Sequence, residues 1–102
     1  MYTPVIPMAQ LQDGDVVPVR IDQVDVLVIM TEGQYFAIAA HCTHARQSLV
    51  SGKLRGFEIS CPLHGARFDL RDGQATKGPA VTAIQRFPVL VDSGKVCVDV
   101  SG

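Results

Sequence analysis

Two cysteine–histidine pairs could do chemistry in this chain: Cys42 and His44 in "HCTHARQ", and Cys61 and His64 in "SCPLHG". The first pair is spaced Cys-x-His and the second Cys-x-x-His, with sixteen residues between the pairs. Thiolate and imidazole are both ligands that transition metals such as zinc and iron accept. Two such pairs in 102 residues predict one shared metal site, and four unrelated core or surface residues are the less favoured interpretation.

The order of ligands within each pair bears on the kind of metal centre. A structural zinc site accepts two Cys and two His, but it usually groups Cys with Cys and His with His. Both pairs here are mixed. A mixed pair suits a binuclear centre, in which each loop gives a thiolate to one metal and an imidazole to its neighbour. That is the ligand set of a Rieske [2Fe–2S] cluster, and zinc stays open as the alternative.

The elements that must position these loops are predicted to be β-strands. Helical periodicity is hard to find, whereas short alternating apolar runs recur between turn residues. Glycine in "TEGQ" (31–34), "RDGQ" (71–74) and "DSGK" (92–95) supplies the positive φ that hairpins need. The expected strands are Val16–Ile21, Val24–Met30, Tyr35–Ala40, Phe57–Ser60, Arg67–Leu70, Val89–Val91 and Val96–Val100.

The six prolines fall at strand starts, edges and loops, which favours a small barrel or sandwich. We therefore predict a single all-β domain over residues 1–102. Residues from about 38 to 80 hold both Cys/His pairs and most of the glycines. They are predicted to form an inserted metal-binding subdomain on a base made from residues 1–37 and 81–102.

Composition excludes several classes of function. The net charge of −1 and 19% charged residues indicate a soluble globular protein with no nucleic-acid or membrane partner. The longest apolar run has six residues, and the start "MYTPVIPMAQ" lacks the features of a signal peptide. We expect a cytoplasmic protein, and in that reducing compartment cysteines are better explained by metal or redox chemistry than by a disulfide.

The sequence resembles the Rieske family, whose motif Cys-x-His, spacer, Cys-x-x-His is matched in full. The resemblance continues through "CPLHGARFDLRDGQATKGPA" (61–80) to the end of the chain. It implies a Rieske fold and one [2Fe–2S] cluster per chain, with Cys42 and Cys61 on the buried iron and His44 and His64 on the outer iron. In the family a proline loop covers the cluster, and "KGPA" (77–80) matches it.

The family branch without a disulfide or membrane anchor contains the ferredoxin components of bacterial aromatic-ring-hydroxylating dioxygenase systems. This resemblance implies a one-electron carrier, not itself an enzyme, between a flavoprotein reductase and a terminal oxygenase. A carrier that visits two partners is most simply a monomer. Two alternatives stay open: a Rieske-like small subunit of an assimilatory nitrite reductase, and a zinc-stabilised interaction module.

Other reactive residues are assigned ordinary roles. His41 is expected to be a solvated loop residue and Cys97 a small strand residue, and Asp69 and Asp72 are expected to belong to a turn. Residues 41–80 carry six cations against three anions, whereas the rest of the chain carries three cations against seven anions. Arg46 and Arg67 each lie within three residues of a predicted ligand histidine. Plain solvated charges are the default interpretation for both, and a basic rim that attracts acidic partners is the alternative.

The sequence also lacks features of the respiratory and photosynthetic Rieske subunits. Those proteins have a disulfide between the loops, and hydroxyl groups that donate to cluster sulfur. The corresponding positions here are Gln47, Leu63, Ala66 and Phe68. Because hydrogen bonds to sulfur stabilise the more negative reduced state, their absence predicts a reduction potential near the low end of the family range, about −150 mV.

Restoring one of these donors should raise the potential. We expect Ala66→Ser or Phe68→Tyr to move the midpoint upward within the family range of about −150 to +300 mV. Protein-film voltammetry of the two variants beside the parent measures the shift. If neither midpoint rises, the alignment of the second loop with the family motif is wrong.

Overall fold

The computed structural model describes residues 1–41, 49–50, 52–61, 66–77 and 83–101, and there the chain is almost entirely β, as predicted. No helix among those residues is long and apolar enough to cross a membrane. The elements in chain order are β1 (Thr3–Pro7), the 3-10 helix η1 (Met8–Gln10), β2 (Val16–Ile21), β3 (Val24–Thr31), β4 (Gln34–Ala39), β5 (Lys53–Arg55), β6 (Glu58–Ser60), β7 (Arg67–Asp69), β8 (Ala75–Lys77), β9 (Arg86–Phe87), β10 (Val89–Asp92) and β11 (Lys95–Val98).

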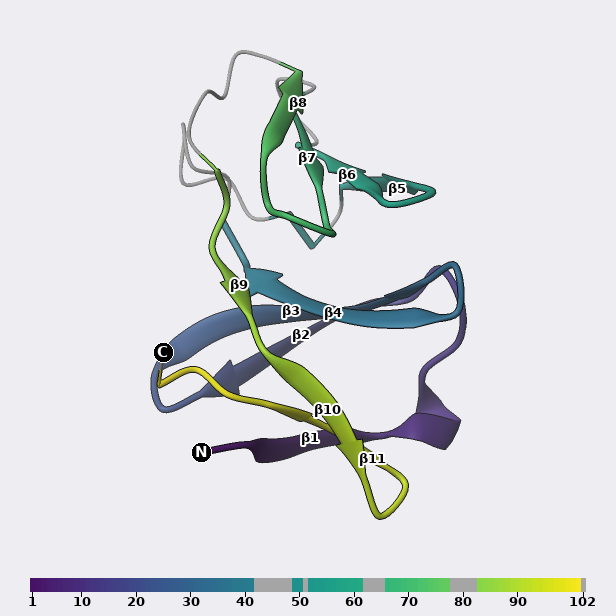
Figure 1. Ribbon diagram of the computed structural model, residues 1–102, viewed down its shortest axis with the longest axis vertical. Helices are drawn as coiled ribbons and strands as arrows, with labels where there is room; N and C mark the ends of the chain where they lie inside the picture. The colour runs from purple at the N-terminus through teal and green to yellow at the C-terminus, as the bar shows by residue number, and fades with distance from the viewer. Residues whose placement is uncertain (42–48, 51, 62–65, 78–82, 102) are drawn as a thin grey trace.

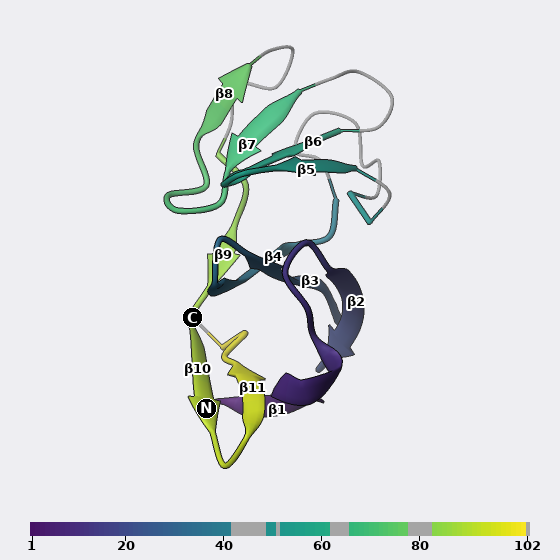
Figure 2. The same ribbon diagram turned by 90° about the vertical axis from the view of Figure 1, so that its right-hand side faces the viewer.

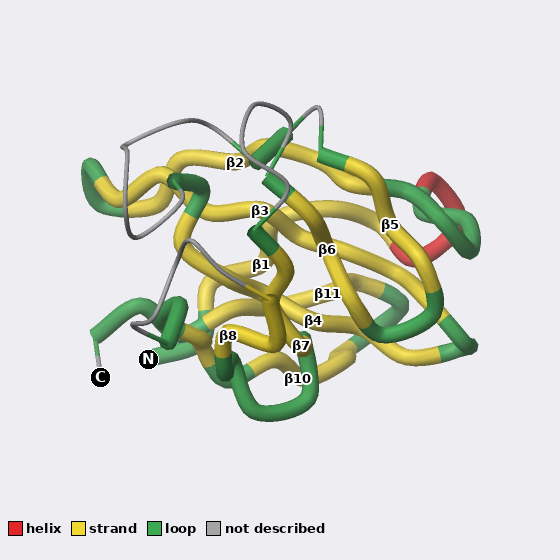
Figure 3. The backbone as a smooth tube through the Cα atoms, turned by 90° about the horizontal axis from the view of Figure 1, so that it is seen from above, coloured by secondary structure: helices red, strands yellow, loops and turns green. Residues whose placement is uncertain are grey.

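The strands form three antiparallel sheets, which are stacked as layers (Figures 1 and 2). The lower sheet has the order β1-β11-β10, the middle sheet β2-β3-β4-β9, and the upper sheet β5-β6-β7-β8. Seen from above, the upper strands lie over the middle sheet (Figure 3). Both chain ends contribute to the lower two sheets. The proposed division of the chain at about residues 38 and 80 stays a prediction.

The middle sheet is buried on both faces, and β3 shows why. Its side chains alternate between two apolar clusters: Val26 and Val28 pack toward the lower sheet, whereas Leu27 and Ile29 pack toward the upper sheet. All four are fully buried. A strand covered on both sides needs apolar residues at consecutive positions, which explains the run Val26–Met30.

The hairpin turns depend on residues with positive φ. In the β3–β4 turn Glu32 and Gly33 have φ of 53° and 72°, and in the β10–β11 turn Ser93 and Gly94 have φ of 53° and 75°. Glycine was expected at both places. The β2–β3 turn reaches the same conformation with Asp22 at 49° and Gln23 at 67°, where no glycine marks it.

The predicted strands are confirmed within one or two residues at each end. Four strands and the 3-10 helix were missed: β1, β5, β8 and β9. β5 and β8 have three residues each and β9 has two, too few for an alternating pattern to show. β1 contains Pro4 and Pro7, which an edge strand tolerates because one side of its backbone has no partner.

A small set of side chains joins the upper sheet to the middle one. The Thr31 hydroxyl, on a residue 4% exposed, donates to the Gly56 carbonyl at 2.6 Å. The Phe36 and Phe57 rings meet edge to face with centroids 6.0 Å apart. Arg71 covers the same Phe57 ring, with its guanidinium carbon 4.7 Å from the centroid. These contacts fix how the upper sheet sits on the base.

Removing the Thr31 hydroxyl tests the junction. Thr31→Val keeps the shape of the side chain but leaves the Gly56 carbonyl without this donor, so the free energy of unfolding should fall by about 1–2 kcal/mol. Urea titration followed by circular dichroism measures it. Thr76→Val is the matched control, because Thr76 is exposed on β8; it should change stability by less than about 0.5 kcal/mol. Equal losses would show that Thr31 carries no special contact.

Candidate metal centre

Of the four predicted ligands, only Cys61 lies among the described residues; Cys42, His44 and His64 lie outside them, as do Arg46, Gln47, Leu63 and Pro79. Cys61 directly follows β6 and is 2% exposed. Its thiol is free, so it is available as a ligand. Its backbone N–H donates to the Ala66 carbonyl at 2.7 Å.

The β6–β7 hairpin sets where the second Cys/His pair begins. Ser60 is directly opposite Arg67, and the hydrogen bond from Cys61 to Ala66 adds the next step of the ladder. Ala66 is fully buried beside Cys61, and so is Phe68 on β7. Two strands thus hold the cysteine backbone rigidly at the end of the hairpin.

The residues that border the first pair are tied to the same hairpin. Leu49 is fully buried, and its N–H donates to the Ala40 carbonyl at 2.7 Å. Gly52 then donates to the Leu49 carbonyl at 2.9 Å. The backbone of Gly52 lies so close to Ser60 that a Cβ at position 52 would overlap the Ser60 carbonyl oxygen. Only glycine allows this approach.

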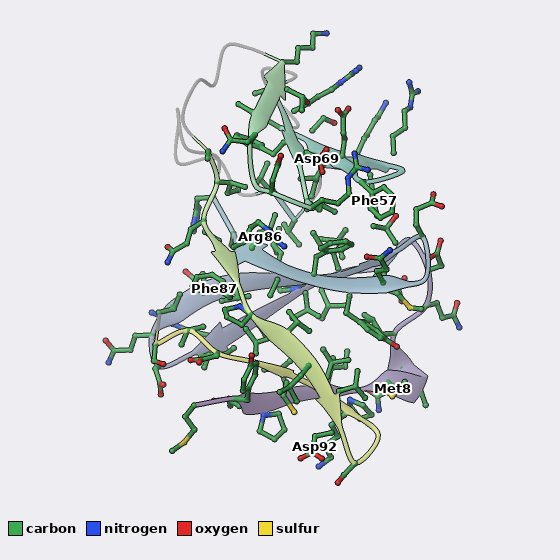
Figure 4. The ribbon with its side chains drawn as sticks, viewed as in Figure 1. Met8, Phe57, Asp69, Arg86, Phe87 and Asp92 are labelled. Atoms are coloured by element: carbon green, nitrogen blue, oxygen red, sulfur yellow. The ribbon has the colours of Figure 1, made fainter. Side chains whose placement is uncertain are left out.

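The residues that follow the segment with Pro79 are anchored to the "RDGQ" turn. The Ile84 N–H donates to the Gly73 carbonyl at 2.7 Å, and Gly73 has φ of 79°. Arg86 donates through Nε to the Leu70 carbonyl at 2.9 Å, which joins β9 to the upper sheet (Figure 4). The roles of Gly52, Gly73 and Arg86 were not predicted, although an isolated glycine is a signal of close backbone approach.

One apolar cluster contains residues that flank three segments: the one with Cys42 and His44, the one with His64, and the one with Pro79. Ala40 and Leu49 border the first, Cys61 and Ala66 the second, and Ile84 follows the third. The chemistry of the predicted donor set fits a [2Fe–2S] group, because two thiolates and two imidazoles are its ligands in the Rieske type. The one donor that the structure describes is a free thiol within this apolar cluster.

The other candidate residues occupy the places that were expected. His41 is exposed, and Cys97 is buried on β11, where its Sγ lies 3.6 Å from the Lys95 carbonyl. Among the described residues, no three His, Cys, Asp or Glu side chains gather as a metal site. Within the described ranges, neither His41 nor Cys97 thus belongs to a group of three potential ligands.

The two aspartates of the "RDGQ" region serve the turn, as predicted. Asp69 accepts a hydrogen bond from the Arg71 side chain at 2.8 Å and another from the Arg71 backbone N–H at 2.9 Å. These bonds lower the pKa of Asp69 below its ordinary value. Asp72 accepts the Gln74 N–H at 2.9 Å. Neither carboxylate is arranged for proton transfer.

Comparison with known proteins gives concordant matches. The family model "Rieske [2Fe-2S] domain" matches residues 1–88. The ferredoxin component of the naphthalene 1,2-dioxygenase system of Pseudomonas putida is 32% identical over 96 residues, which cover 94% of this chain and 92% of that protein. The ferredoxin of carbazole 1,9a-dioxygenase from Nocardioides aromaticivorans IC177 superposes with a TM-score of 0.91 at 32% identity, covering 96% of both chains.

A further solved structure contains a ferredoxin together with its partner. It is described as a complex of reduced oxygenase and oxidized ferredoxin in carbazole 1,9a-dioxygenase. The matched chain is 31% identical with a TM-score of 0.89, and the match covers 95% of this chain and 91% of that one.

The close approach at Gly52 should be needed for metal binding. We expect Gly52→Ala to push the end of the first segment away from Ser60, to cost about 1–3 kcal/mol of stability, and to reduce the bound metal per chain. Elemental analysis of purified protein and urea titration measure the two effects. Gly56→Ala is the control: Gly56 has φ of 59° with open space around it, so it should lose about 1 kcal/mol and keep its metal. Equal metal loss in both variants would contradict the role of Gly52.

Proposed function

The chain belongs to the Rieske [2Fe–2S] domain family, and we propose that it is the ferredoxin component of an aromatic-ring dioxygenase system. The observation that carries this function is the reciprocal coverage of the matches. Relatives that are themselves separate ferredoxin components align over nearly their whole length. Those relatives are electron-transfer components and not catalytic oxygenases, so the same assignment is made for this chain.

The cofactor is a Rieske-type [2Fe–2S] cluster, which when bound takes up and releases one electron at a time. We assign Cys42 and Cys61 to one iron and His44 and His64 to the other. Support for this assignment comes from the match to the family motif and from the place of Cys61. Its backbone is fixed by Ala66, and apolar side chains surround it.

The chain's own residues supply insulation and rigidity around that ligand. Leu49, Ile59 and Phe68 are fully buried in the cluster that contains Cys61, so water is kept from this side of the centre. Low polarity raises the cost of placing charge there. The hydrogen bonds at Cys61 and Ile84 limit movement of the backbone when the redox state changes.

We propose two protein partners for the carrier. A terminal oxygenase is the acceptor, in line with the solved complex between a similar ferredoxin and its oxygenase. A flavoprotein reductase is the donor, and the carrier is a cytoplasmic monomer that moves between them. The nitrite reductase subunit and the zinc module are disfavoured, because the similar proteins are named as dioxygenase ferredoxins.

Metal content and matched variants test the ligand assignment. Protein purified without oxygen should contain iron and acid-labile sulfide in equal amounts, and should give a Rieske-type electron paramagnetic resonance signal when reduced. Cys61→Ser should lose iron and signal, whereas Cys97→Ser should keep both. His44→Gln should lose them, whereas His41→Gln should not. Stoichiometric zinc without iron or labile sulfide would refute the assignment.

Reconstitution tests the function itself. Mixed with NAD(P)H, a dioxygenase reductase and a terminal oxygenase from the same organism, the wild-type chain should restore turnover of the aromatic substrate. The Cys61→Ser variant should not. If turnover is equally fast without the chain, the carrier role fails, whatever cluster the protein holds.

A further inference from the structure

The outer face of the upper sheet carries a row of cations that strand register brings together. Lys53 is directly opposite Ser60, Ser60 is opposite Arg67, and Arg67 is opposite Lys77. Directly opposed residues of an antiparallel pair point to the same side of a sheet. Three strands thus place three cationic side chains in one line, which we call the cationic row (Lys53, Arg67 and Lys77).

The other face of the same sheet fixes the direction of the row. Leu54, Ile59, Phe68 and Ala75 are opposed in turn across the four strands and pack in the core cluster. Because side chains alternate along β5 and β7, Lys53 and Arg67 face outward. On β8 the pairing with β7 shifts between Ala75 and Lys77, and this bulge lets Ala75 face the core while Lys77 faces outward. Lys53 and Lys77 are exposed, and Arg67 is partly exposed. Nitrogen-tipped side chains extend outward from this sheet in Figure 4.

The charge of the row is not compensated within the described part of the chain. The anions on this face, Glu58 and Asp69, lie one step away along the strands, opposite each other and beside Arg55. Asp69 is paired with Arg71 at 2.8 Å. No carboxylate among the described residues lies within 4.0 Å of a nitrogen of Lys53, Arg67 or Lys77.

The row also lies at the ends of β6 and β7 that lead to the second predicted ligand pair. Ser60 and Arg67 directly border Cys61 and Ala66, at the two ends of the segment that contains His64. Lys53 follows Gly52, which packs against Ser60. A hollow of about 70 Å³ lies on this surface, lined by Lys53, Arg55, Glu58, Ser60 and Arg67. It has room for a few water molecules or for the end of an acidic side chain.

We propose that the cationic row is the docking surface for the terminal oxygenase, and that it recognises an acidic patch on that protein. The inference rests on the proposed function and adds the surface and its charge. Charge complementarity supports it, because an uncompensated cationic line beside the metal centre attracts anionic surfaces and speeds their encounter. The acidic remainder of the chain, with three cations against seven anions, repels such a patch and turns the row toward it.

Two variants with the same change of charge at different places test the proposal. Lys53→Glu/Lys77→Glu alters the row and leaves unchanged Arg67, the row residue nearest in the sequence to the predicted ligand His64. Gln10→Glu/Gln12→Glu/Lys95→Glu alters exposed residues on or beside the lower sheet. Both lower the formal net charge by the same four units, so a pure net-charge effect is equal in the two. Reduction potential and electron paramagnetic resonance spectrum of each variant establish that the cluster is intact.

Binding and electron transfer to the oxygenase are measured first. Stopped-flow mixing gives the second-order rate constant for one electron passing from the reduced carrier to the oxidised terminal oxygenase of the same organism. Calorimetry gives the Kd of the two oxidised proteins. At low ionic strength the row variant should be slower by at least about tenfold and bind more weakly, and its rate should depend less on salt. The control variant should stay within about twofold of wild type.

Small redox-active ions test the electrostatic field of the row in the absence of a protein partner. Oxidation of the reduced carrier by anionic ferricyanide should be slower in the row variant, and oxidation by cationic hexaammineruthenium(III) should be faster. The control variant should change both rates much less, because its altered charges lie at or near η1 and on β11, on the side of the middle sheet away from the upper sheet.

The following outcomes would contradict the proposal or the function on which it rests. Equal slowing in the two variants, or an unchanged oxygenase rate, overturns the docking surface. Slowing confined to reduction by the flavoprotein reductase assigns the row to the reductase and overturns the oxygenase assignment. If the wild-type carrier itself passes no electrons to the oxygenase, the proposed function fails; the ion measurements then show separately whether the row governs access to the centre.

Discussion

The structure depends on a middle sheet that must be covered on both faces. Val26 and Val28 face one cluster while Leu27 and Ile29 face the other, and all four are fully buried. Burying each such side chain is worth about 1.5–3 kcal/mol. The lower and upper sheets are therefore not independent modules, because each supplies half of the cover that β3 needs. Because β3 is apolar on both faces, a difference between a polar and an apolar face cannot fix its register. The positive-φ turns at residues 22–23 and 32–33 must therefore fix it.

The same alternation gives the two faces of the upper sheet different roles. Along β6, Ile59 points into the core and Ser60 points outward; along β7, Phe68 points inward and Arg67 outward. The inner row surrounds the Cys61 thiol with apolar side chains, and the outer row sets the charge that an approaching protein meets. Insulation and recognition thus come from adjacent residues of the same strands, one of which points inward and the next outward.

The sequence predicted the parts of this arrangement that are local. The ligand candidates follow from spacing, and the long hairpins follow from apolar runs and from glycines such as Gly33 and Gly94, both of which have positive φ. Short strands left no pattern, and the Asp22–Gln23 turn has no glycine. The excess of cations and the place of Arg67 near a ligand were visible in the sequence. The alignment of Lys53, Arg67 and Lys77 was not, because only the pairing of β5 to β8 makes them neighbours.

Anchoring in one cluster makes the metal centre and the fold a single cooperative unit. Leu49, Cys61 and Ile84 each border a different predicted loop, yet they pack in the same core as Leu27 of the middle sheet. A metal that binds only the folded chain adds its binding free energy to folding. Ligation at Cys61 must therefore stabilise the packing beneath all three segments, and disorder in that packing must weaken the site. The scaffold and the centre are stable together because neither can relax alone.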